Sequence, residues 1–274
     1  MRKILAVSGG IDSVVMLHYL RQEPNVLVAH FDHGIRPNSS EDCLFVERLA
    51  QSYHLPFAVE HARLGEDCSE ATARTKRYAF LSSLCEFPDD EIYVAHHADD
   101  VIESIVINLL RGTGWRGLAP MRNAKLCRPL LRWTKTDIYR YATEHQLHFR
   151  QDQTNTDDTY LRNRVREQLR SVSTTTKEQL LNLYEHQVTI ATEIDDILDA
   201  IEESPRHPRT TILELEDSLA QEILRAILRR QGIAQTRPQL QRAIEAIRTY
   251  APGKSFPLDA NHSIRLYKYH YQIC

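Results

Sequence analysis

A loop near the start of the chain has the residue types of an anion-binding site: Ser8-Gly9-Gly10-Ile11-Asp12-Ser13. The apolar run at residues 4–7 predicts a buried strand before the loop, and the apolar spacing of residues 13–22 predicts a helix after it. Adjacent glycines let the backbone approach an anion, and the N–H groups at the start of a helix point towards it. We therefore predict that phosphate groups bind to Ser8, Gly9, Gly10, Ile11, Asp12 and Ser13.

Asp12 distinguishes this loop from other phosphate-binding loops. Its carboxylate would repel a bare phosphate, so Asp12 predicts a Mg²⁺ ion between the carboxylate and the phosphates. The loop has neither the lysine of G-x-x-x-x-G-K-[ST] nor the spacing of G-x-G-x-x-G. The alternative is an ordinary Ser/Gly turn in which Ser13 caps the following helix.

Three carboxylates gather at the start of another predicted helix, over residues 99–111, directly after a predicted strand. Asp99 and Asp100 are adjacent, and Glu103 shares a helix face with Asp100. We predict catalytic roles for all three; the alternative is that they only complement the helix dipole. Arg111 ends the same helix, and we predict that it contacts a carboxylate or a phosphate, with the dipole at that end as the alternative.

His96 and His97 immediately precede the three acids, and this raises the question of a metal site. Adjacent side chains at the end of a strand point in opposite directions, and no third soft ligand is spaced to complete a zinc site. We therefore assign no zinc ion to this pair, and Asp12 is the metal ligand that we predict.

Short β-branched runs alternate with amphipathic segments over the first 150 residues. Apolar strands between helices are typical of a parallel sheet covered on both faces, so we predict an α/β fold with a doubly wound, mostly parallel sheet. Ligands bind such sheets at the carboxyl ends of the strands. Asp32, His33 and Arg36 follow the second predicted strand, and we expect them to contact a nucleotide. The alternatives are a packed loop residue for His33 and a surface ion pair for Arg36.

The pattern changes after about residue 175, where helical stretches replace the alternation. Residues 176–203, 221–231 and 237–249 predict three helices, and the alternation from Phe256 to Tyr271 predicts a β-hairpin that turns at residues 259–261. We expect a second, smaller helical domain and a C-terminal hairpin. The predicted limits are 1–172 for the α/β domain, 173–250 for the helical domain and 251–274 for the hairpin.

The composition is that of an ordinary globular chain of 274 residues, 26% charged and 42% hydrophobic. No apolar run reaches the roughly 18–20 residues of a membrane helix, and the apolar run near the start is too short for a signal peptide. We therefore expect a cytoplasmic protein with no membrane partner. The five cysteines include no C-x-x-C pair, which is typical of free thiols in a reducing compartment.

The net charge of −3 hides an asymmetry along the chain. Residues 121–170 carry 11 Lys and Arg against 6 Asp and Glu, whereas residues 171–220 carry 3 against 11. The basic block is either a surface for a polyanionic partner or a solvated helix face. Its arginines are Arg128, Arg132, Arg162, Arg164, Arg166 and Arg170, and the family resemblance described next implies that they bind RNA.

The loop after the first strand resembles that of the PP-loop ATP pyrophosphatases, which cleave ATP between the α- and β-phosphates. Over about residues 1–170, further segments in the same order resemble the tRNA(Ile)-lysidine synthase family. These segments are Asp32-His33-Gly34-Ile35-Arg36, Ala73-Arg74-Thr75-Lys76-Arg77-Tyr78, Ala95-His96-His97-Ala98-Asp99-Asp100, Leu110-Arg111-Gly112-Thr113-Gly114, Arg128-Pro129-Leu130-Leu131, Asp152-Gln153-Thr154-Asn155 and Arg162-Asn163-Arg164-Val165-Arg166.

The resemblance implies an ATP-dependent ligase that uses ATP, Mg²⁺, free L-lysine and a tRNA(Ile) with a CAU anticodon. Lysine would be joined to C2 of the wobble cytidine through an adenylated tRNA intermediate, with release of pyrophosphate and AMP. Of Asp99, Asp100 and Glu103, one carboxylate would recognise the ammonium groups of lysine and another would accept a proton. Which carboxylate is the base stays open, as does the choice between a monomer and a homodimer.

The chain departs from the family pattern at Val101 and Ser104, where Gln and Thr are usual. Serine keeps the hydroxyl group, so only the role of the amide is lost. The main alternative is an ATP-dependent tRNA cytidine 2-thiolation enzyme of the same superfamily, which would need cysteine pairs or an iron–sulfur cluster. An amidotransferase-type ligase would leave the arginine block unexplained, and an ATP-binding RNA sensor would leave the three acids unexplained.

Overall fold

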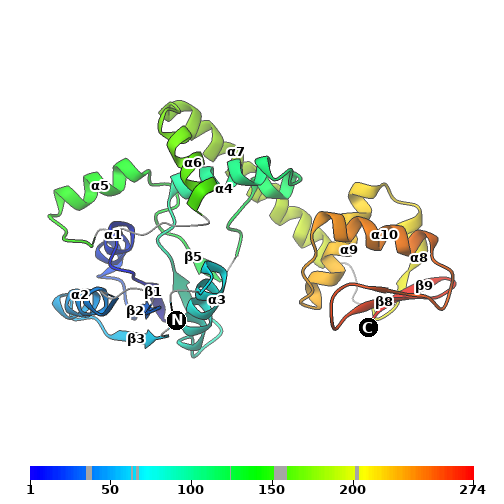
Figure 1. Ribbon diagram of the computed structural model, residues 1–274, viewed down its shortest axis with the longest axis horizontal. Coiled ribbons are helices and arrows are strands. Elements are labelled where there is room, and N and C mark those ends of the chain that lie inside the picture. The colour runs from blue at the N-terminus through cyan, green and yellow to red at the C-terminus, as the bar shows by residue number, and fades with distance from the viewer. Residues whose placement is uncertain (35–38, 63, 66–67, 124, 151–158, 201–203) are drawn as a thin grey trace. The chain divides into compact units, whose positions relative to one another are not determined.

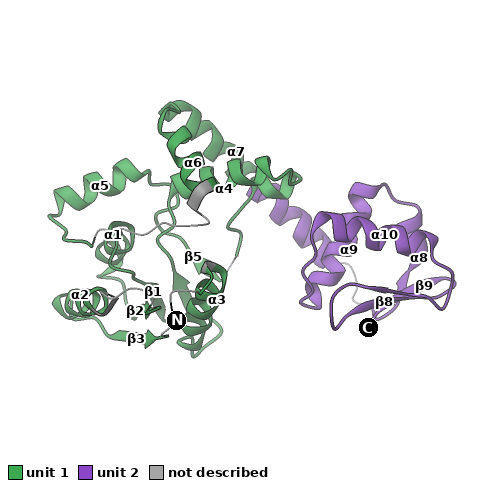
Figure 2. Ribbon diagram, in the orientation of Figure 1, with its two compact units in different colours: residues 1–187 green, residues 188–274 purple. Residues whose placement is uncertain are grey.

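A computed structural model of the chain describes residues 1–34, 39–62, 64–65, 68–123, 125–150, 159–200 and 204–274. The chain divides into two compact units, Met1–Gln187 (unit 1) and Val188–Cys274 (unit 2), which Figure 2 shows in different colours. The division falls inside one helix, α7 (Thr174–Asp199). The domain limits drawn from the sequence, at residues 172 and 250, remain predictions.

Unit 1 is built on a sheet of five described strands in the order β3-β2-β1-β4-β5 (Figure 1). Every pair of neighbouring strands is parallel, with Ile4 opposite Leu27 on one side and Ile92 on the other. The strands are β1 (Lys3–Ala6), β2 (Val26–Asp32), β3 (Phe57–His61), β4 (Glu91–Tyr93) and β5 (Leu126–Cys127).

Alternate side chains of the strands enter two separate cores, one on each face of the sheet. Leu5 and Val28 pack with Leu17 of α1 and Ile138 of α5 on one face. On the other face Ile4, Ala29 and Ile92 pack with Phe80 and Leu81 of α3. Helices therefore cover both faces, and the predicted doubly wound, mostly parallel α/β fold is confirmed.

The helices of unit 1 begin where the sequence supplies caps. Ser69 accepts a hydrogen bond from the backbone N–H of Thr72 at the start of α3, and Thr134 accepts one from Asp137 at the start of α5. The helices are α1 (Ile11–Leu20), α2 (Ser39–Ser52), α3 (Glu70–Ser83), α4 (Ala98–Leu110), the 3₁₀ turn η1 (Trp115–Leu118), α5 (Lys135–Glu144), α6 (Thr159–Arg170) and the first part of α7.

The strand order creates a switch point between β1 and β4. The chain leaves β1 for β2 on one side, whereas β4 pairs with β1 on the other side. A ligand crevice is expected at the carboxyl ends of strands at such a switch point. Two segments follow β1 and β4 there: the loop Ser8–Ser13 and the run that begins at His96.

Unit 2 has its own apolar core, in which Leu224, Leu240 and Ile244 from helices pack against Leu266 and Tyr271 from strands. Its helices are the rest of α7, α8 (Arg209–Leu213), α9 (Asp217–Arg230) and α10 (Arg237–Thr249). Its strands pair antiparallel in the order β6-β9-β8-β7, and they are β6 (His207–Pro208), β7 (Ser255–Pro257), β8 (Ser263–Leu266) and β9 (His270–Ile273).

The C-terminal hairpin is present, but its second arm is two strands rather than one. The alternation through Tyr267, Tyr269 and Tyr271 predicted a continuous strand, whereas the backbone turns between β8 and β9. Tyr267 donates its N–H to the carbonyl of His270, Tyr269 is 71% exposed, and Tyr271 is fully buried. Period-2 spacing therefore continued across a turn that carries no glycine or proline. Among the described residues, no helix has the length and hydrophobicity needed to span a bilayer.

Candidate active site

The loop Ser8–Ser13 joins β1 to α1 with a tightly bonded backbone. Ser13 Oγ accepts hydrogen bonds from the N–H groups of Ser8 and Gly9, at 3.1 and 3.2 Å, and donates to the carbonyl of Gly10 at 2.9 Å. Ser13 is therefore a brace within the loop, and Gly10 occupies the N-cap position of α1. The buried hydroxyl of Ser13 fixes the turn that leads the chain into the helix.

Gly9 shows why this loop needs glycine. Its φ is +91°, a backbone conformation that residues with a Cβ rarely adopt. A Cβ here would also lie 3.4 Å from both Phe45 and Val46 of α2. The carbonyl of Gly9 accepts a hydrogen bond from the N–H of Arg150. The loop is thus held between α2 and the segment after α5, and the N-terminal N–H groups of α1 face the carboxyl edge of the sheet.

Asp12, in the first turn of α1, is the point where the loop contacts the rest of the site. Its Oδ1 lies 2.5 Å from Nζ of Lys135, at the start of α5. The same oxygen lies 3.9 Å from Nε2 of His97, and that nitrogen lies 3.5 Å from Oδ2 of Asp100. The structure therefore brings Asp12 and the acids of α4 together around the buried His97.

The three acids of α4 have different partners. Asp99 Oδ1 accepts from Nζ of Lys177 and Oδ2 from the backbone N–H of Lys135, both at 2.8 Å. Burial raises the pKa of Asp99, but these two hydrogen bonds, together with the electrostatic effects of Lys177 and His97, outweigh it and hold the pKa below its usual range. Asp100 Oδ2 accepts from the N–H of His97 and so caps α4.

Glu103 is the most buried of the acids, 4% exposed. Its Oε2 lies 3.1 Å from a guanidinium nitrogen of Arg166 on α6, and the same nitrogen lies 3.7 Å from Asp100 Oδ1. Burial raises the pKa of Glu103 even though Arg166 opposes the shift. Its second oxygen, Oε1, is buried without a hydrogen-bond partner among the described residues, as is Nδ1 of His97.

The residues after β2 form a smaller cluster of their own. Asp32 is 8% exposed; one of its oxygens accepts from the N–H of Gly34 and the other lies 2.9 Å from Nδ1 of His61. Asp32 thus shapes the turn that carries the half-buried His33. Arg36 lies outside the described residues, as does the segment Asp152–Asn155.

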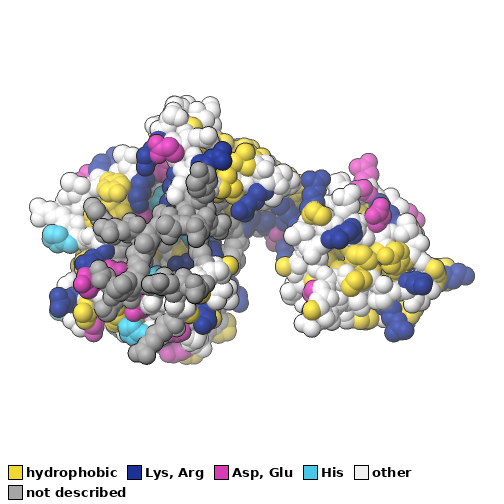
Figure 3. Space-filling model, viewed as in Figure 1, with side chains coloured by type: hydrophobic (Ala, Val, Ile, Leu, Met, Phe, Trp, Pro, Cys, Tyr) yellow, Lys and Arg dark blue, Asp and Glu magenta, His cyan; other side chains and the backbone are white. Residues whose placement is uncertain are grey.

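The predicted RNA-binding arginines do not share one environment. Arg166 contacts the acids of α4 directly, and burial lowers the pKa of the half-buried Arg128, whose guanidinium donates to the carbonyl of Leu126. Arg132 pairs with Glu185 at 2.8 Å and Arg170 with Glu167 at 2.7 Å, and Arg162 and Arg164 are exposed on α6. On the face in Figure 3, Lys and Arg side chains of unit 1 lie among other side-chain types.

Arg111 is not brought to the three acids. It is exposed and follows the C-terminal end of α4, which begins at Ala98 and ends at Leu110. Twelve residues of helix place it about 18 Å along the axis from Asp99. A direct role beside the carboxylates therefore finds no support in the geometry, and Arg111 remains a predicted contact for a larger ligand.

Two lysines contact the carboxylates of the site although the sequence did not predict these contacts. Lys135 and Lys177 bind the carboxylates of Asp12 and Asp99, from 123 and 78 residues away in the sequence. Lys135 lies in the basic block and begins a helix at a Thr-x-x-Asp capping box, which is the signal that could have drawn attention to it. Lys177 carries no local signal.

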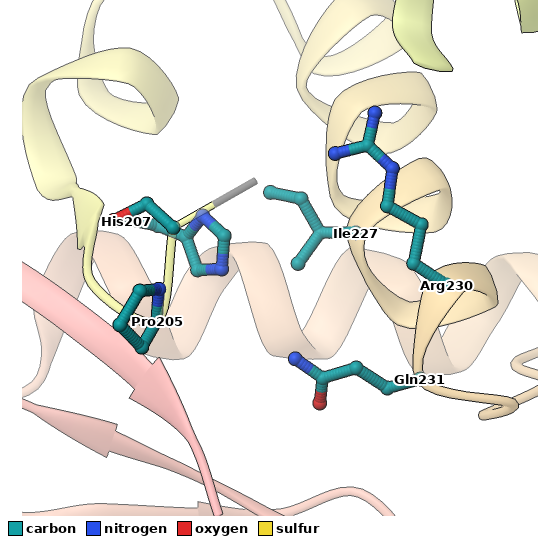
Figure 4. A pocket seen from close by; sticks show the side chains of 6 residues that line it. Pro205, His207, Ile227, Arg230 and Gln231 are labelled. Atoms are coloured by element: carbon teal, nitrogen blue, oxygen red, sulfur yellow. The ribbon is translucent and has the colours of Figure 1, made fainter. Parts of the chain in front are cut away.

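Two further observations bear on ligands. Among the described residues, no group of three or more His, Cys, Asp or Glu side chains could hold a metal ion. A pocket of about 280 Å³ lies in unit 2, whereas every predicted site residue belongs to unit 1 (Figure 4). Burial and the nearby Arg230 lower the pKa of His207 in its lining, which consists of Ser204, Pro205, His207, Ile227, Arg230 and Gln231.

A glycine-containing loop between the first strand and first helix, at the switch point of a doubly wound sheet, is typical of a class of nucleotide-binding α/β domain. Comparison with family models narrows the class, because residues 1–173 match the PP-loop domain model. The chain belongs to the PP-loop domain family, and this membership implies the use of ATP.

Curated relatives match the same part of the chain. The tRNA(Ile)-lysidine synthase of Geobacter sulfurreducens is 38% identical over 187 residues, and that of Actinobacillus pleuropneumoniae is 33% identical over 174. The bifunctional protein TilS/HprT of Listeria innocua is 36% identical over 184 residues. Each match covers 61% of this chain, and 39%, 41% and 28% of the respective relative, so the chain spans less than half of the length of these relatives.

A solved structure shows the same fold. The U34-tRNA thiolase NcsA of Methanococcus maripaludis superposes with a TM-score of 0.56 at 18% identity, over 69% of this chain and 73% of the thiolase.

Proposed function

We propose that this chain ligates free lysine to C2 of the wobble cytidine of a tRNA(Ile) with a CAU anticodon, forming lysidine at the expense of ATP. In the first step the cytosine O2 attacks the α-phosphorus and pyrophosphate leaves. In the second step the lysine ε-amine attacks C2 and AMP leaves. The observation that carries the proposal is the junction of the phosphate loop with the acids of α4, through Asp12 and His97.

The loop supplies the binding site for the triphosphate. The N–H groups at the start of α1 and the hydroxyl of Ser8 provide donors for phosphate oxygens. Lys135 Nζ, which pairs with Asp12, adds a positive charge on the same side. Positioning and neutralisation of the charge that develops on pyrophosphate make up most of the catalysis of such a step.

The carboxylate of Asp12 suits a Mg²⁺ ion that travels with ATP. Mg²⁺ takes one or two protein carboxylates and completes its octahedron with phosphate oxygens and waters, so it needs no dedicated cluster of three protein ligands. Asp12 is 34% exposed at its side chain and lies next to the loop. When bound, the ion would neutralise part of the negative charge on the phosphates.

Glu103, Asp100 and Arg166 fit the zwitterionic part or the ammonium group of free lysine. Both carboxylates lie within 4 Å of one guanidinium nitrogen of Arg166, at a half-buried position. Among the described residues, Oε1 of Glu103 is buried without a hydrogen-bond donor, and an ammonium group would supply that donor. The raised pKa of Glu103 also suits a group that accepts a proton from the attacking amine.

The exposed arginines of α6 support the RNA part of the proposal. Arg162 and Arg164 lie on the same helix as Arg166, which reaches the acids. RNA phosphates bound along this helix would bring a nucleotide towards Glu103. A tRNA of these relatives' specificity is the substrate that we propose.

Incubation of the protein with ATP, Mg²⁺, radiolabelled lysine and a CAU-anticodon tRNA(Ile) transcript tests the function. We expect label in the RNA, dependent on ATP, and none when the wobble cytidine is replaced by uridine. If no lysine enters the RNA but a sulfur donor yields 2-thiocytidine, the chain is a thiolation enzyme and the proposal is wrong.

A further inference from the structure

Asp99 differs from its neighbours because both of its carboxylate oxygens are already bonded within the protein. Oδ1 accepts from Lys177 Nζ and Oδ2 from the backbone N–H of Lys135. These donors belong to α7 and α5, so the single side chain of Asp99 ties three helices together. Asp100 and Glu103, by contrast, have the guanidinium of Arg166 as their long-range partner.

Lys177 occupies a position that a lysine does not favour on its own. It lies in the first turn of α7, where the helix dipole opposes a positive charge. Its side chain is only 22% exposed, and that of Asp99 is 25% exposed. A partly buried ammonium at a helix N-terminus needs a carboxylate partner, and Asp99 is 2.8 Å away.

We propose that Lys177 is a positioning residue for the active site: it fixes the carboxylate of Asp99, which in turn holds the start of α5 beside the nucleotide loop. The connection continues from Asp99 through the backbone of Lys135 to the Lys135 ammonium and from there to Asp12. Each link is a hydrogen bond of 2.5 to 2.8 Å.

This inference rests on the proposed function and divides the labour among the three acids. Asp99 is a positioning residue, because both of its oxygens already accept hydrogen bonds from within the protein, one from the Lys177 ammonium and one from the N–H of Lys135. Recognition of lysine and acceptance of its proton then fall to Asp100 and Glu103. Oε1 of Glu103, which has no hydrogen-bond partner among the described residues, can accept a hydrogen bond from the lysine ammonium.

The groups that face Asp99 are the Lys177 ammonium from α7, the backbone N–H of Lys135 from α5 and the His97 imidazole at the N-cap of α4, whose Nδ1 lies 3.9 Å from Asp99 Oδ2. Removal of the Lys177 ammonium raises the pKa of Asp99, since Lys177 is a main cause of its depression. Protonation of Asp99 would then disrupt the link at a higher pH than in the unaltered protein.

Lys177→Met tests the assignment, with Lys177→Arg as the conservative variant and Lys254→Met, at an exposed position of unit 2, as the control. For the lysine-transfer reaction we expect Lys177→Met to lower kcat by roughly tenfold to a hundredfold and to move the acid limb of the pH profile to higher pH. Lys177→Arg should restore both. An unaltered pH profile in Lys177→Met, or equal losses in the Met and Arg variants, would overturn the proposal.

A double-mutant cycle separates this inference from the proposed function, because it needs no activity. Melting temperatures are measured for Lys177→Met, Asp99→Asn and the double variant. We expect each single variant to melt about 3–6 °C lower than the unaltered protein. The melting temperature of the double variant should fall by much less than the sum of these two losses. Strictly additive losses would show that the two side chains are not coupled, whatever reaction the enzyme catalyses.

Discussion

Asp12 is the residue through which the loop Ser8–Ser13 contacts the other residues of the candidate site. Its Oδ1 contacts Lys135 at 2.5 Å and lies 3.9 Å from His97. A carboxylate in a phosphate loop is unfavourable unless a cation accompanies the phosphates. In the free protein Lys135 supplies that cation, and in the nucleotide complex we expect Mg²⁺ to share the carboxylate.

Asp12→Ala should lower the rate of pyrophosphate release by roughly a hundredfold to a thousandfold, because it removes a charge that acts on the leaving group. The measurement is pyrophosphate release in the presence of the tRNA transcript and lysine. Asp89→Ala, an exposed aspartate in the turn before β4, is the matched control and should react normally. Normal release by Asp12→Ala would refute the metal assignment of this residue.

His96 predicts a pH dependence of stability. Burial lowers its pKa to about 4 from 6.5, so the folded protein holds it neutral while the unfolded chain takes up a proton at pH 6.5. The free energy of unfolding should therefore fall as the pH drops from about 6.5 to 4, by at most about 3 kcal/mol from this residue.

Urea denaturation of His96→Asn across this pH range checks the sign. The variant should lose part of the slope, because burial also lowers the pKa of His18 to about 4 and that residue remains. His148→Gln, at an exposed position, should keep the full slope. A His96→Asn slope equal to that of the unaltered protein contradicts the assignment.

Local motifs let the sequence predict one part of the site and not the other. The loop Ser8–Ser13 and the three acids of α4 were accessible because each is a short run at the end of an apolar strand. The partners of these residues were not accessible, because Lys135 and Lys177 join them only through tertiary packing. The contact of Arg166 with Glu103 was hidden for the same reason, within a run of arginines that resembled a solvated face.

At the scale of elements, the strands and helices with strong periodicity were predictable and the short ones were not. The first strand and the helices α1 and α4 were expected at residues 4–7, 13–22 and 99–111, within a few residues of their observed limits. Strand β5 has two residues and α5 has a mostly polar sequence, so neither has a pattern of its own. Ile138 and Ala142 are the two buried residues of α5, and two apolar residues are too few to define a period.

Helix α6 allows its arginines to be separated by function. Arg164→Ala should weaken tRNA binding and reduce the slope of log K against log salt by about 0.7–0.9, as expected for the loss of one phosphate contact. Filter binding over a range of salt concentrations, with ATP binding as the control, measures this. Two results would contradict the assignment: an unchanged slope, or a loss of ATP binding.

Arg166→Ala should behave differently, because Arg166 pairs with the buried Glu103. Removing one partner of a partly buried pair leaves an uncompensated charge and should lower stability by about 2–3 kcal/mol. We also expect the KM for lysine to rise while the salt slope changes less than in Arg164→Ala. Denaturation and lysine titration measure these effects, and a salt slope as altered as that of Arg164→Ala would place Arg166 on the RNA surface instead.

At the scale of the whole molecule, the chain consists of two units with separate apolar cores. The sequence indicated a second unit from the loss of strand–helix alternation. The division between the two units falls inside α7, which is one uninterrupted helix from Thr174 to Asp199. Hydrophobic spacing continues through that helix whichever core it serves.

Separate cores predict separate responses to core truncation. Leu17→Ala in unit 1 and Leu224→Ala in unit 2 each remove a fully buried side chain and should cost about 2–5 kcal/mol. In a calorimetric scan we expect two transitions, with Leu17→Ala lowering one and Leu224→Ala the other. A single transition that both variants lower equally would show that the units unfold as one.

The products formed from α-labelled ATP test the central claim most directly, namely that the Ser8–Ser13 loop holds ATP for attack on its α-phosphorus by RNA. The labelled nucleotide is incubated with the protein, Mg²⁺, lysine and the CAU-anticodon tRNA(Ile), and the products are separated by chromatography. The label stays with the α-phosphate, so we predict labelled AMP and, in a separate assay, an equal amount of unlabelled pyrophosphate, both formed only when the RNA is present. Formation of ADP and phosphate, or AMP formation that does not depend on the RNA, would contradict the account.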